Sequence, residues 1–310
     1  MNYKYLYESC TLCPRKCRVN RHTIKGLCGC TDTIKAARAA LHHWEEPCIS
    51  GSRGSGTIFF SGCTLRCCFC QNHTISQEGA GEELTEEELA DIFLDLQDQG
   101  AHNLNLVTAT QYLPSILEAL DLVKDKLTIP VVYNCGGYES ASIIKALKDY
   151  VDIWLPDLKY QSPELSFRYS KASDYFESAA EAILQMIDQT GAPRFDCKGI
   201  ITKGVIIRHM ILPGGRKDSI NLLHWMKNNL PDGMYYISLL SQYTPFFHSK
   251  DYPEINRRIT TYEYNTVLKE AINLGLDQGF MQEKSSAKEE YTPDFDLEGI
   301  KKKNQSRFQL

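Results

Sequence analysis

Residues 57–72 read Thr-Ile-Phe-Phe-Ser-Gly-Cys-Thr-Leu-Arg-Cys-Cys-Phe-Cys-Gln-Asn, a short apolar run followed directly by a cluster of cysteines. The apolar and β-branched residues 57–60 predict a strand. Cys63, Cys67 and Cys70 are separated by three and then two residues. Thiolates this close can surround one metal centre, and three of them leave a coordination position open to a non-protein ligand. The same spacing would also suit buried core cysteines, or three ligands of a structural zinc whose fourth partner lies elsewhere.

This run resembles the signature of the radical S-adenosylmethionine (SAM) enzymes, in which Phe69 fills the aromatic position before the third cysteine. Gln71 and Asn72 resemble the residues that follow in the activating enzymes of pyruvate formate-lyase and related glycyl-radical enzymes. In that family, three cysteines hold a four-iron four-sulfur (4Fe-4S) cluster whose fourth iron binds SAM. Cys68 has no counterpart in the pattern. The resemblance assigns the cluster ligands to Cys63, Cys67 and Cys70.

Beyond residue 60 the chain alternates short β-branched runs with amphipathic segments. Further strands are predicted at residues 103–107, 129–133, 151–155, 204–212 and 234–240. Helices are predicted to begin near Thr85, Pro114, Glu139, Ser173, Asp218 and Thr261. A strand followed by a helix, repeated six times, specifies a mainly parallel α/β sheet. This pattern leaves open whether the sheet closes, and the resemblance implies a partial (β/α)6 barrel of the radical SAM type.

Composition is consistent with one enzyme domain and an appendage. The chain has 310 residues, is 43% hydrophobic and carries a formal net charge of -5. This charge gives no reason to expect nucleic acid or an anionic membrane as a partner. We found neither an apolar run long enough to span a membrane nor a signal peptide, so we expect a soluble, cytoplasmic protein. Twelve cysteines in that compartment indicate metal binding and not a disulfide framework.

Active residues of parallel α/β folds lie at the carboxyl ends of the strands. After the second predicted strand, Thr108 and Thr110 stand where the activating enzymes usually carry a Gly-Gly-Glu segment that meets the amino group of SAM. Threonine oxygens can accept from an ammonium, although both residues could also simply close the strand. After the fourth strand, Asp157 and Lys159 resemble an Asp-Leu-Lys segment that binds SAM in those enzymes. Alternatively, Asp157 and Lys159 form only a local ion pair at the end of the strand.

Two more positions follow from the resemblance. Arg208, in the fifth predicted strand, would lie near the carboxylate or the ribose of SAM, whereas His209 would face the protein core. Tyr243 stands where the family places a histidine that contacts the ribose. The complete set of predicted cofactor-binding residues is Phe69, Asn72, Thr108, Thr110, Asp157, Lys159, Arg208 and Tyr243.

The first 30 residues hold a second group of cysteines. Cys10, Cys13, Cys17 and Cys28 could close a tetrahedral zinc site or hold a second iron-sulfur cluster, and the nearby Cys30 would then be spare. A redox pair in a Cys-X-X-Cys motif is the alternative. We therefore expect a cysteine-rich module at residues 1–50, a radical SAM barrel at 51–284 and a tail at 285–310.

The functional prediction is an enzyme that reductively cleaves SAM at a 4Fe-4S cluster to a 5′-deoxyadenosyl radical, which abstracts hydrogen from a substrate. By resemblance to the activating enzymes, that substrate is a glycine of a glycyl-radical enzyme, and a flavodoxin or ferredoxin would supply the electron. Two alternatives stay open. One is radical modification of another peptide or a small molecule, and the other is a non-catalytic iron-sulfur or zinc protein.

Overall fold

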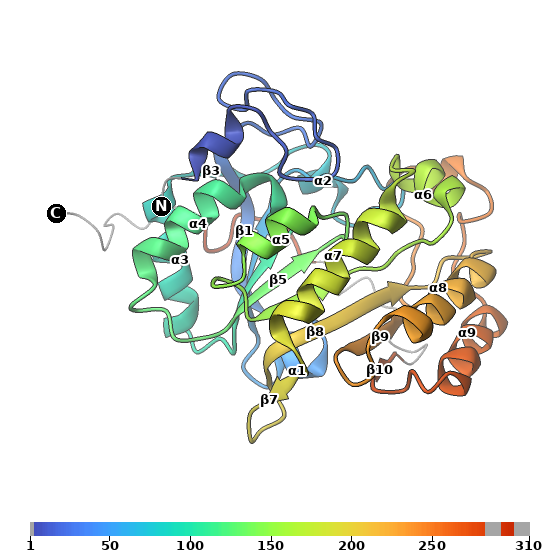
Figure 1. Ribbon diagram of the computed structural model, residues 1–310. Coiled ribbons are helices and arrows are strands. Elements are labelled where there is room, and N and C mark those ends of the chain that lie inside the picture. The colour runs from blue at the N-terminus through green and yellow to red at the C-terminus, as the bar shows by residue number, and fades with distance from the viewer. Residues whose placement is uncertain (1–2, 283–292, 301–310) are drawn as a thin grey trace.

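A single mixed sheet forms the centre of the molecule, seen in a computed structural model that describes residues 3–282 and 293–300 (Figure 1). Its strand order is β10-β9-β8-β6-β5-β4-β2-β1-β3, with β7 paired to β8. The strands are β1 (Ile34–His42), β2 (Ser55–Phe60), β3 (Glu82–Leu84), β4 (Leu104–Val107), β5 (Val131–Cys135), β6 (Ile153–Pro156), β7 (Arg194–Phe195), β8 (Ile201–Met210), β9 (Tyr236–Leu240) and β10 (Gly279–Met281).

The six predicted strands correspond to β2, β4, β5, β6, β8 and β9, which pair in parallel in that order. Among the described residues, the strands at the two ends of the sheet do not pair with each other, so the sheet curves without closing. The predicted partial (β/α)6 barrel is therefore confirmed. Because the strands are parallel, their carboxyl ends meet at one rim, where the residues that follow them come together.

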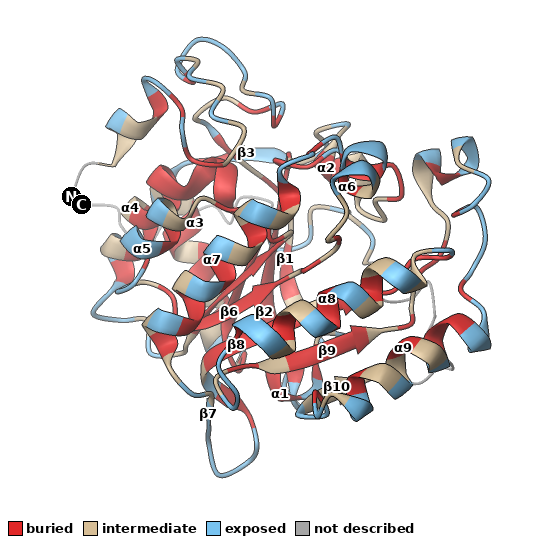
Figure 2. Cartoon of the chain, turned by 45° about the vertical axis from the view of Figure 1, so that its right-hand side comes forward, coloured by how far each residue is buried: buried red, intermediate tan, exposed pale blue. Residues whose placement is uncertain are grey.

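Helices wrap the outside of this sheet (Figure 1). Those of the barrel are α3 (Glu86–Asp98), α4 (Leu113–Val123), α5 (Ala141–Ala146), α6 (Pro163–Ser170), α7 (Tyr175–Thr190), α8 (Arg216–Asn229) and α9 (Thr261–Asn273). Short turns of helix complete the described chain: α1 (Pro47–Ser50), α2 (His73–Ser76), η1 (Lys4–Tyr7), η2 (Thr110–Tyr112) and η3 (Phe247–Asp251). Helix α3 begins at the predicted Thr85 with a capping box, in which Thr85 and Glu88 are bonded reciprocally. Most barrel helices bury one face and expose the other, whereas α4 is buried along most of its length (Figure 2).

Strand β1 is the main element that the sequence pattern missed. Its segment, Ile-Lys-Ala-Ala-Arg-Ala-Ala-Leu-His, is rich in alanine, a strong helix former, and lacks clear alternation. It nevertheless pairs antiparallel with β2 and β3, so sheet contacts override its local preference. Residues 51–56 form a turn that enters β2 and is buried from Gly54 onward.

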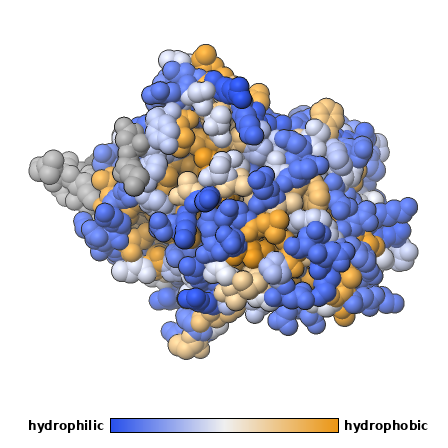
Figure 3. All heavy atoms as spheres, viewed as in Figure 1, coloured by the Kyte–Doolittle hydropathy of each residue, from blue (hydrophilic) through white to orange (hydrophobic). Residues whose placement is uncertain are grey.

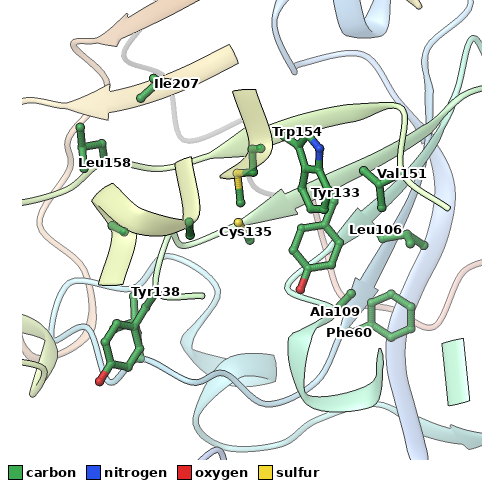
Figure 4. Packing of buried hydrophobic residues seen from close by; sticks show 14 of the residues in the cluster. Phe60, Leu106, Ala109, Tyr133, Cys135, Tyr138, Val151, Trp154, Leu158 and Ile207 are labelled. Atoms are coloured by element: carbon green, nitrogen blue, oxygen red, sulfur yellow. The ribbon is translucent and has the colours of Figure 1, made fainter. Parts of the chain in front are cut away.

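The core lies between the sheet and the helices. Tyr133 and Trp154, from neighbouring strands, meet edge to face with ring centroids 5.4 Å apart (Figure 4). Phe60 and Leu106 belong to the same buried cluster. The outer face in Figure 3 is largely hydrophilic, with scattered apolar patches. The core thus fixes the strands that carry the site, while the rim remains free to bind ligands.

Candidate active site

The cysteine loop, residues 61–72, is held in place by backbone hydrogen bonds to two other segments. Gly62 N donates to Ile75 O at 2.9 Å, and Cys68 N donates to Tyr169 O at 2.8 Å. Gly62 has φ +81°, and a Cβ added there would lie 2.0 Å from the sulfur of Cys30. Only glycine meets both conditions, so the cysteine-rich module packs directly on the start of the loop.

Cys63, Cys67 and Cys70 all line one cavity of about 260 Å³ at the rim of the barrel. Cys68 is buried and is not among its lining residues. The thiols have polar neighbours: Cys67 Sγ lies 3.0 Å from Ser170 Oγ, Cys70 Sγ lies 3.3 Å from Ser76 Oγ, and Leu65 N donates to Cys63 Sγ at 3.4 Å. Hydrogen bonds of this kind stabilise thiolates that hold an iron-sulfur cluster.

Burial raises the pKa of all three thiols, that of Cys70 to about 11. Without metal, these groups are therefore protonated at neutral pH. Because thiolates are the form that binds metal, loading the site must release protons. Three thiols are by their chemistry the donor set that such a cluster requires, and the positive charge of Lys159 opposes the raised pKa of Cys67. In the described residues, the three side chains do not stand in a geometry that could hold a metal ion.

A half-buried group of charged side chains forms another part of the wall of this cavity. Asp157 contacts both Lys159, at 2.5 Å, and Arg208, whose Nε donates to Asp157 Oδ1 at 2.9 Å. Arg208 Nη1 donates to Glu45 Oε2 at 3.1 Å, and its Nη2 donates to Asn134 Oδ1. The structure thus brings together the three charged residues predicted from the sequence and adds Glu45 and Asn134.

Electrostatic interactions favour the charged forms of Asp157 and Lys159, but not that of Glu45. Burial opposes ionisation of Asp157, but the charges of Arg208 and Lys159 outweigh it and lower the pKa of the carboxyl. Burial likewise opposes the charge of Lys159, and Asp157 raises the pKa of that ammonium. For Glu45, burial is the largest effect and raises the pKa, with Arg208 acting against it. A carboxylate and an ammonium in this setting can recognise the charged ends of an amino-acid ligand.

The remaining predicted residues divide into two groups. Phe69, Asn72 and Thr108 line the same cavity, and Thr108 has an unusual φ of +58°. Thr110 and Tyr243 lie outside its lining. Thr110 Oγ1 donates to Glu139 Oε1 at 2.8 Å, and Tyr243 is 1% exposed with its hydroxyl donating to Ile255 O at 2.8 Å. A role for these two in SAM binding stays a prediction.

Sequence reasoning missed several residues that line this cavity. Gln242 lies beside Tyr243 in sequence but lines the cavity, and Trp44 and Glu45 enter from the segment after β1. Asn134 follows the same rule as the predicted residues, because it stands near the carboxyl end of β5. That rule could have identified Asn134. Nothing in the sequence signals Trp44 and Glu45, because they precede the first predicted strand.

His209 occupies the opposite face of β8 and is buried. Its Nδ1 lies 2.6 Å from Leu158 O, and its Nε2 lies 2.8 Å from Ser219 Oγ. Both ring nitrogens have partners, so the expectation of a core histidine is confirmed.

In the cysteine-rich module, the four predicted metal ligands lie around one cavity. Cys10, Cys13, Cys17 and Cys28 line one small cavity of about 10 Å³, together with Thr64 and Gln111 from the barrel. Cys30 is not part of this lining, and its Sγ lies 3.6 Å from Ser61 O. In the described ranges, no three His, Cys, Asp or Glu side chains are placed so that they could hold a metal ion. A second metal site therefore stays a prediction.

Arg15 connects this module to the cysteine loop. Its Nε donates to Thr64 O at 3.0 Å and its Nη2 to Ser170 O at 3.3 Å, and Nη1 donates to Lys171 O. From the barrel side, Arg66 Nη2 donates to Leu27 O at 3.2 Å. These contacts hold the module against the cysteine loop.

Comparisons with known proteins identify the family. Residues 57–215 match the Radical SAM superfamily. A relative from Methanocaldococcus jannaschii, named uncharacterized protein MJ0674, is 31% identical over 284 residues, which cover 88% of this chain and 77% of the relative. The chain belongs to the radical SAM superfamily. Membership implies a 4Fe-4S cluster, SAM and an electron donor, and the three thiols beside the charged wall fit that requirement.

Solved structures show likeness of fold. Streptococcus suis SuiB bound to S-adenosylmethionine matches 71% of this chain with a TM-score of 0.48 at 13% identity. Native anSMEcpe with bound AdoMet matches 71% with a TM-score of 0.46 at 14% identity, and methylornithine synthase (PylB) matches 68% with 0.45 at 16%. The matches cover 48%, 61% and 59% of those chains, so this chain spans about half to three fifths of their length. Likeness at this level carries no argument about activity.

No helix in the described part of the chain has both the length and the apolar character that crossing a membrane requires.

Proposed function

We propose that this radical SAM enzyme generates a glycine-centred radical on a partner protein. The observation that carries the proposal is the convergence of Cys63, Cys67 and Cys70 with Asp157 and Lys159 on one cavity. This is the arrangement that the resemblance to the glycyl-radical activating enzymes requires. A pure electron carrier would need no half-buried ion pair beside its cluster, since withdrawing charges from water is costly.

When bound, a 4Fe-4S cluster would supply one electron to SAM, so that its carbon–sulfur bond breaks into methionine and a 5′-deoxyadenosyl radical. The residues of this chain would hold the cluster and bind SAM. Cys63, Cys67 and Cys70 would hold three irons and leave the fourth to SAM. Asp157 would accept from the amino group of SAM, and Lys159 would donate to its carboxylate. With a substrate seated in the open side of the barrel, the walls would exclude water and keep the radical from stray hydrogen donors.

The proposed substrate is a backbone glycine. Glycine has no side chain to block approach to its α-hydrogen, and transfer requires the reacting atoms to lie about 3 to 3.5 Å apart. An open barrel can admit an extended loop of a partner to that distance. The adenosyl radical would take one hydrogen atom, giving 5′-deoxyadenosine and a glycyl radical.

Electron paramagnetic resonance tests this proposal. The reduced, reconstituted enzyme is mixed anaerobically with SAM and each glycyl-radical enzyme encoded by the same organism. A persistent glycine-centred doublet with one partner is the expected result. Cleavage of SAM without a doublet in any mixture would contradict the glycine assignment and favour another peptide or a small molecule. The Cys63, Cys67 and Cys70 triple alanine variant is the matched control and should lose both the cluster spectrum and SAM cleavage.

We also propose that Cys10, Cys13, Cys17 and Cys28 bind a second metal, since all four line one cavity. Metal analysis should compare the wild type with the quadruple serine variant of these positions. Removing residues before position 40 instead would cut into β1 and its pairing with β2. Equal iron and zinc content in the two proteins would eliminate the second site.

A further inference from the structure

The first 30 residues, which hold the cysteines of the module, carry a charge opposite to that of the rest of the chain. They contain six Lys or Arg residues and one Glu, a net charge of +5, whereas the whole chain has -5, so residues 31–310 carry -10. Four thiolates around a divalent metal centre would reduce the charge of this region and still leave it positive. The module is therefore a basic region on an acidic protein.

Three exposed cations of the module come from two neighbouring segments. Lys16 and Arg18 flank Cys17, and Lys25 precedes Gly26. A Cβ built on Gly26 would lie 3.5 Å from the sulfur of Cys17, so the two segments are in contact. Within the described part of the chain, none of the three cations has a carboxylate partner. Their positive charges are therefore left uncompensated.

Exposed apolar side chains stand among these cations. Ile24 and Leu27, on the same segment as Lys25, are 57% and 58% exposed. Figure 3 shows the module at the top of the molecule, with hydrophobic and hydrophilic atoms side by side on its surface. Apolar side chains surrounded by charged ones are typical of surfaces at which proteins dock.

The basic surface continues onto the cysteine loop at Arg66. This exposed residue directly precedes Cys67, and its Nη2 donates to Leu27 O at 3.2 Å. The hydrogen bonds of Arg15 likewise all go to backbone carbonyl oxygens. A carbonyl group carries no net charge, so both guanidinium groups keep their positive charge. The basic surface thus comes within one residue of a predicted cluster ligand.

This surface offers an approach to the cluster that avoids the cavity. SAM and the substrate would bind in the cavity, so an electron donor needs another route to the cluster. Electron transfer slows steeply as the distance between donor and acceptor grows. A donor protein must therefore dock close to the three cysteines, on the outside of their loop.

We propose that the electron donor docks on this surface, and that the donor is an acidic carrier protein. The docking surface consists of Lys16, Arg18, Ile24, Lys25, Leu27 and Arg66. Electron carriers form small interfaces, in which complementary charge speeds association. In the complex the carrier loses one electron and the cluster gains it, and no bond is made or broken. This inference rests on membership of the radical SAM superfamily and is independent of the glycine assignment.

Surface plasmon resonance tests the docking, with the reconstituted enzyme passed over immobilised, oxidised bacterial flavodoxin as the acidic carrier. We expect binding whose affinity falls at least about tenfold between about 0.05 and 0.5 M salt, because salt screens exposed charges. No binding, or an affinity that does not change with salt, would overturn the proposal. Tighter binding of a random-sequence RNA oligonucleotide than of flavodoxin would also overturn it, because the surface would then serve nucleic acid.

Charge reversal locates the docking surface. Lys16→Glu combined with Lys25→Glu should weaken flavodoxin binding at least about tenfold. The matched control combines Lys217→Glu and Lys269→Glu, exposed positions on α8 and α9, which lie away from the module (Figure 1). Both double variants change the net charge by the same amount. An equal loss of affinity in the control would show that net charge alone matters and would overturn the proposal.

Stopped-flow reduction of the cluster separates loss of docking from damage to the cluster site. Flavodoxin hydroquinone should reduce the Lys16→Glu, Lys25→Glu variant about tenfold more slowly than the wild type. The radical cation of methyl viologen needs no docking surface and should reduce the variant at least as fast as the wild type. Equal slowing with both reductants would overturn the proposal. Docking and reduction need no substrate, so a missing glycine doublet would contradict the proposed function alone.

Discussion

Asp157 is the residue on which the charged wall of the cluster cavity depends, because both Lys159 and Arg208 contact it. We expect Asp157→Ala and Lys159→Ala each to weaken SAM binding about tenfold or more, since a charge-assisted hydrogen bond contributes about 1.5 to 3 kcal/mol. The measurement is calorimetric titration of SAM into reconstituted protein. The iron content of both variants should equal that of the wild type. Glu164→Ala, an exposed carboxylate on α6, is the control. If both variants bind SAM within twofold of the wild-type affinity, the two residues form only a local ion pair and do not bind SAM.

The free energy of unfolding should depend on pH through the buried carboxyl group of Glu139. Burial raises its pKa to about 8, and Thr110 Oγ1 donates to it at 2.8 Å. Between the unfolded pKa of 4.5 and the folded value of about 8, the folded protein holds a proton that the unfolded chain has released. The contribution of this group to stability is therefore fully present below pH 4.5 and is lost as the pH rises toward 8.

The Glu139→Gln variant keeps the shape and cannot titrate. Its free energy of unfolding should fall less steeply than that of the wild type from pH 5 to pH 8, by at most about 1.4 kcal/mol per pH unit. Urea denaturation at several pH values measures this slope. Glu181→Gln, exposed on α7, should leave the slope as it is in the wild type. Parallel curves for wild type and Glu139→Gln would show that Glu139 titrates normally.

At the scale of elements, the cysteine loop depends on close packing against the cysteine-rich module. Gly62→Ala imposes a side chain at φ +81° and puts Cβ 2.0 Å from Cys30 Sγ. We expect the free energy of unfolding to fall by about 2 to 5 kcal/mol, the sum of left-handed strain and overpacking. The measurement is chemical denaturation of the metal-free protein.

Two variants separate these causes. Gly79→Ala has φ +72° with no atom within 4 Å of the added Cβ, so it carries the strain alone. Cys30→Ala combined with Gly62→Ala removes the sulfur and should recover most of the difference between Gly62→Ala and Gly79→Ala. If the double variant is no more stable than Gly62→Ala, the contact between the module and the loop is not what restricts this position.

At the scale of the whole molecule, Arg15 couples the module to the barrel through three backbone carbonyls, those of Thr64, Ser170 and Lys171. Arg15→Met keeps the aliphatic stem and removes these bonds, so we expect stability to fall by about 1.5 to 3 kcal/mol. The bound cluster should also bleach faster in air, because Thr64 and Ser170 neighbour its cysteines. Arg18→Met, exposed in the same module, is the control. Equal bleaching rates in wild type and both variants would contradict the coupling.

Much of this molecule could be predicted from local sequence. The spacing of Cys63, Cys67 and Cys70 predicted that one loop carries all three thiols, since thiols within eight residues must lie close together. Periods of two and of 3.6 residues located the six parallel strands and the main helices, and the rule for strand ends placed Asp157 and Lys159 at the rim, whereas Arg208 was predicted from the resemblance. These inferences succeeded because each depends on neighbours along the chain.

Only the tertiary structure decided the rest. Strand β1 has a helix-forming composition, and its pairing with β2 brings Glu45 and Glu46 into the barrel from a segment that no motif marks. Thr110 and Tyr243 stand at the expected strand ends, yet their side chains bond to Glu139 and Ile255, away from the cavity. Whether a side chain faces a cavity or the core depends on which distant groups can satisfy it. That information arises only when segments far apart in sequence come together.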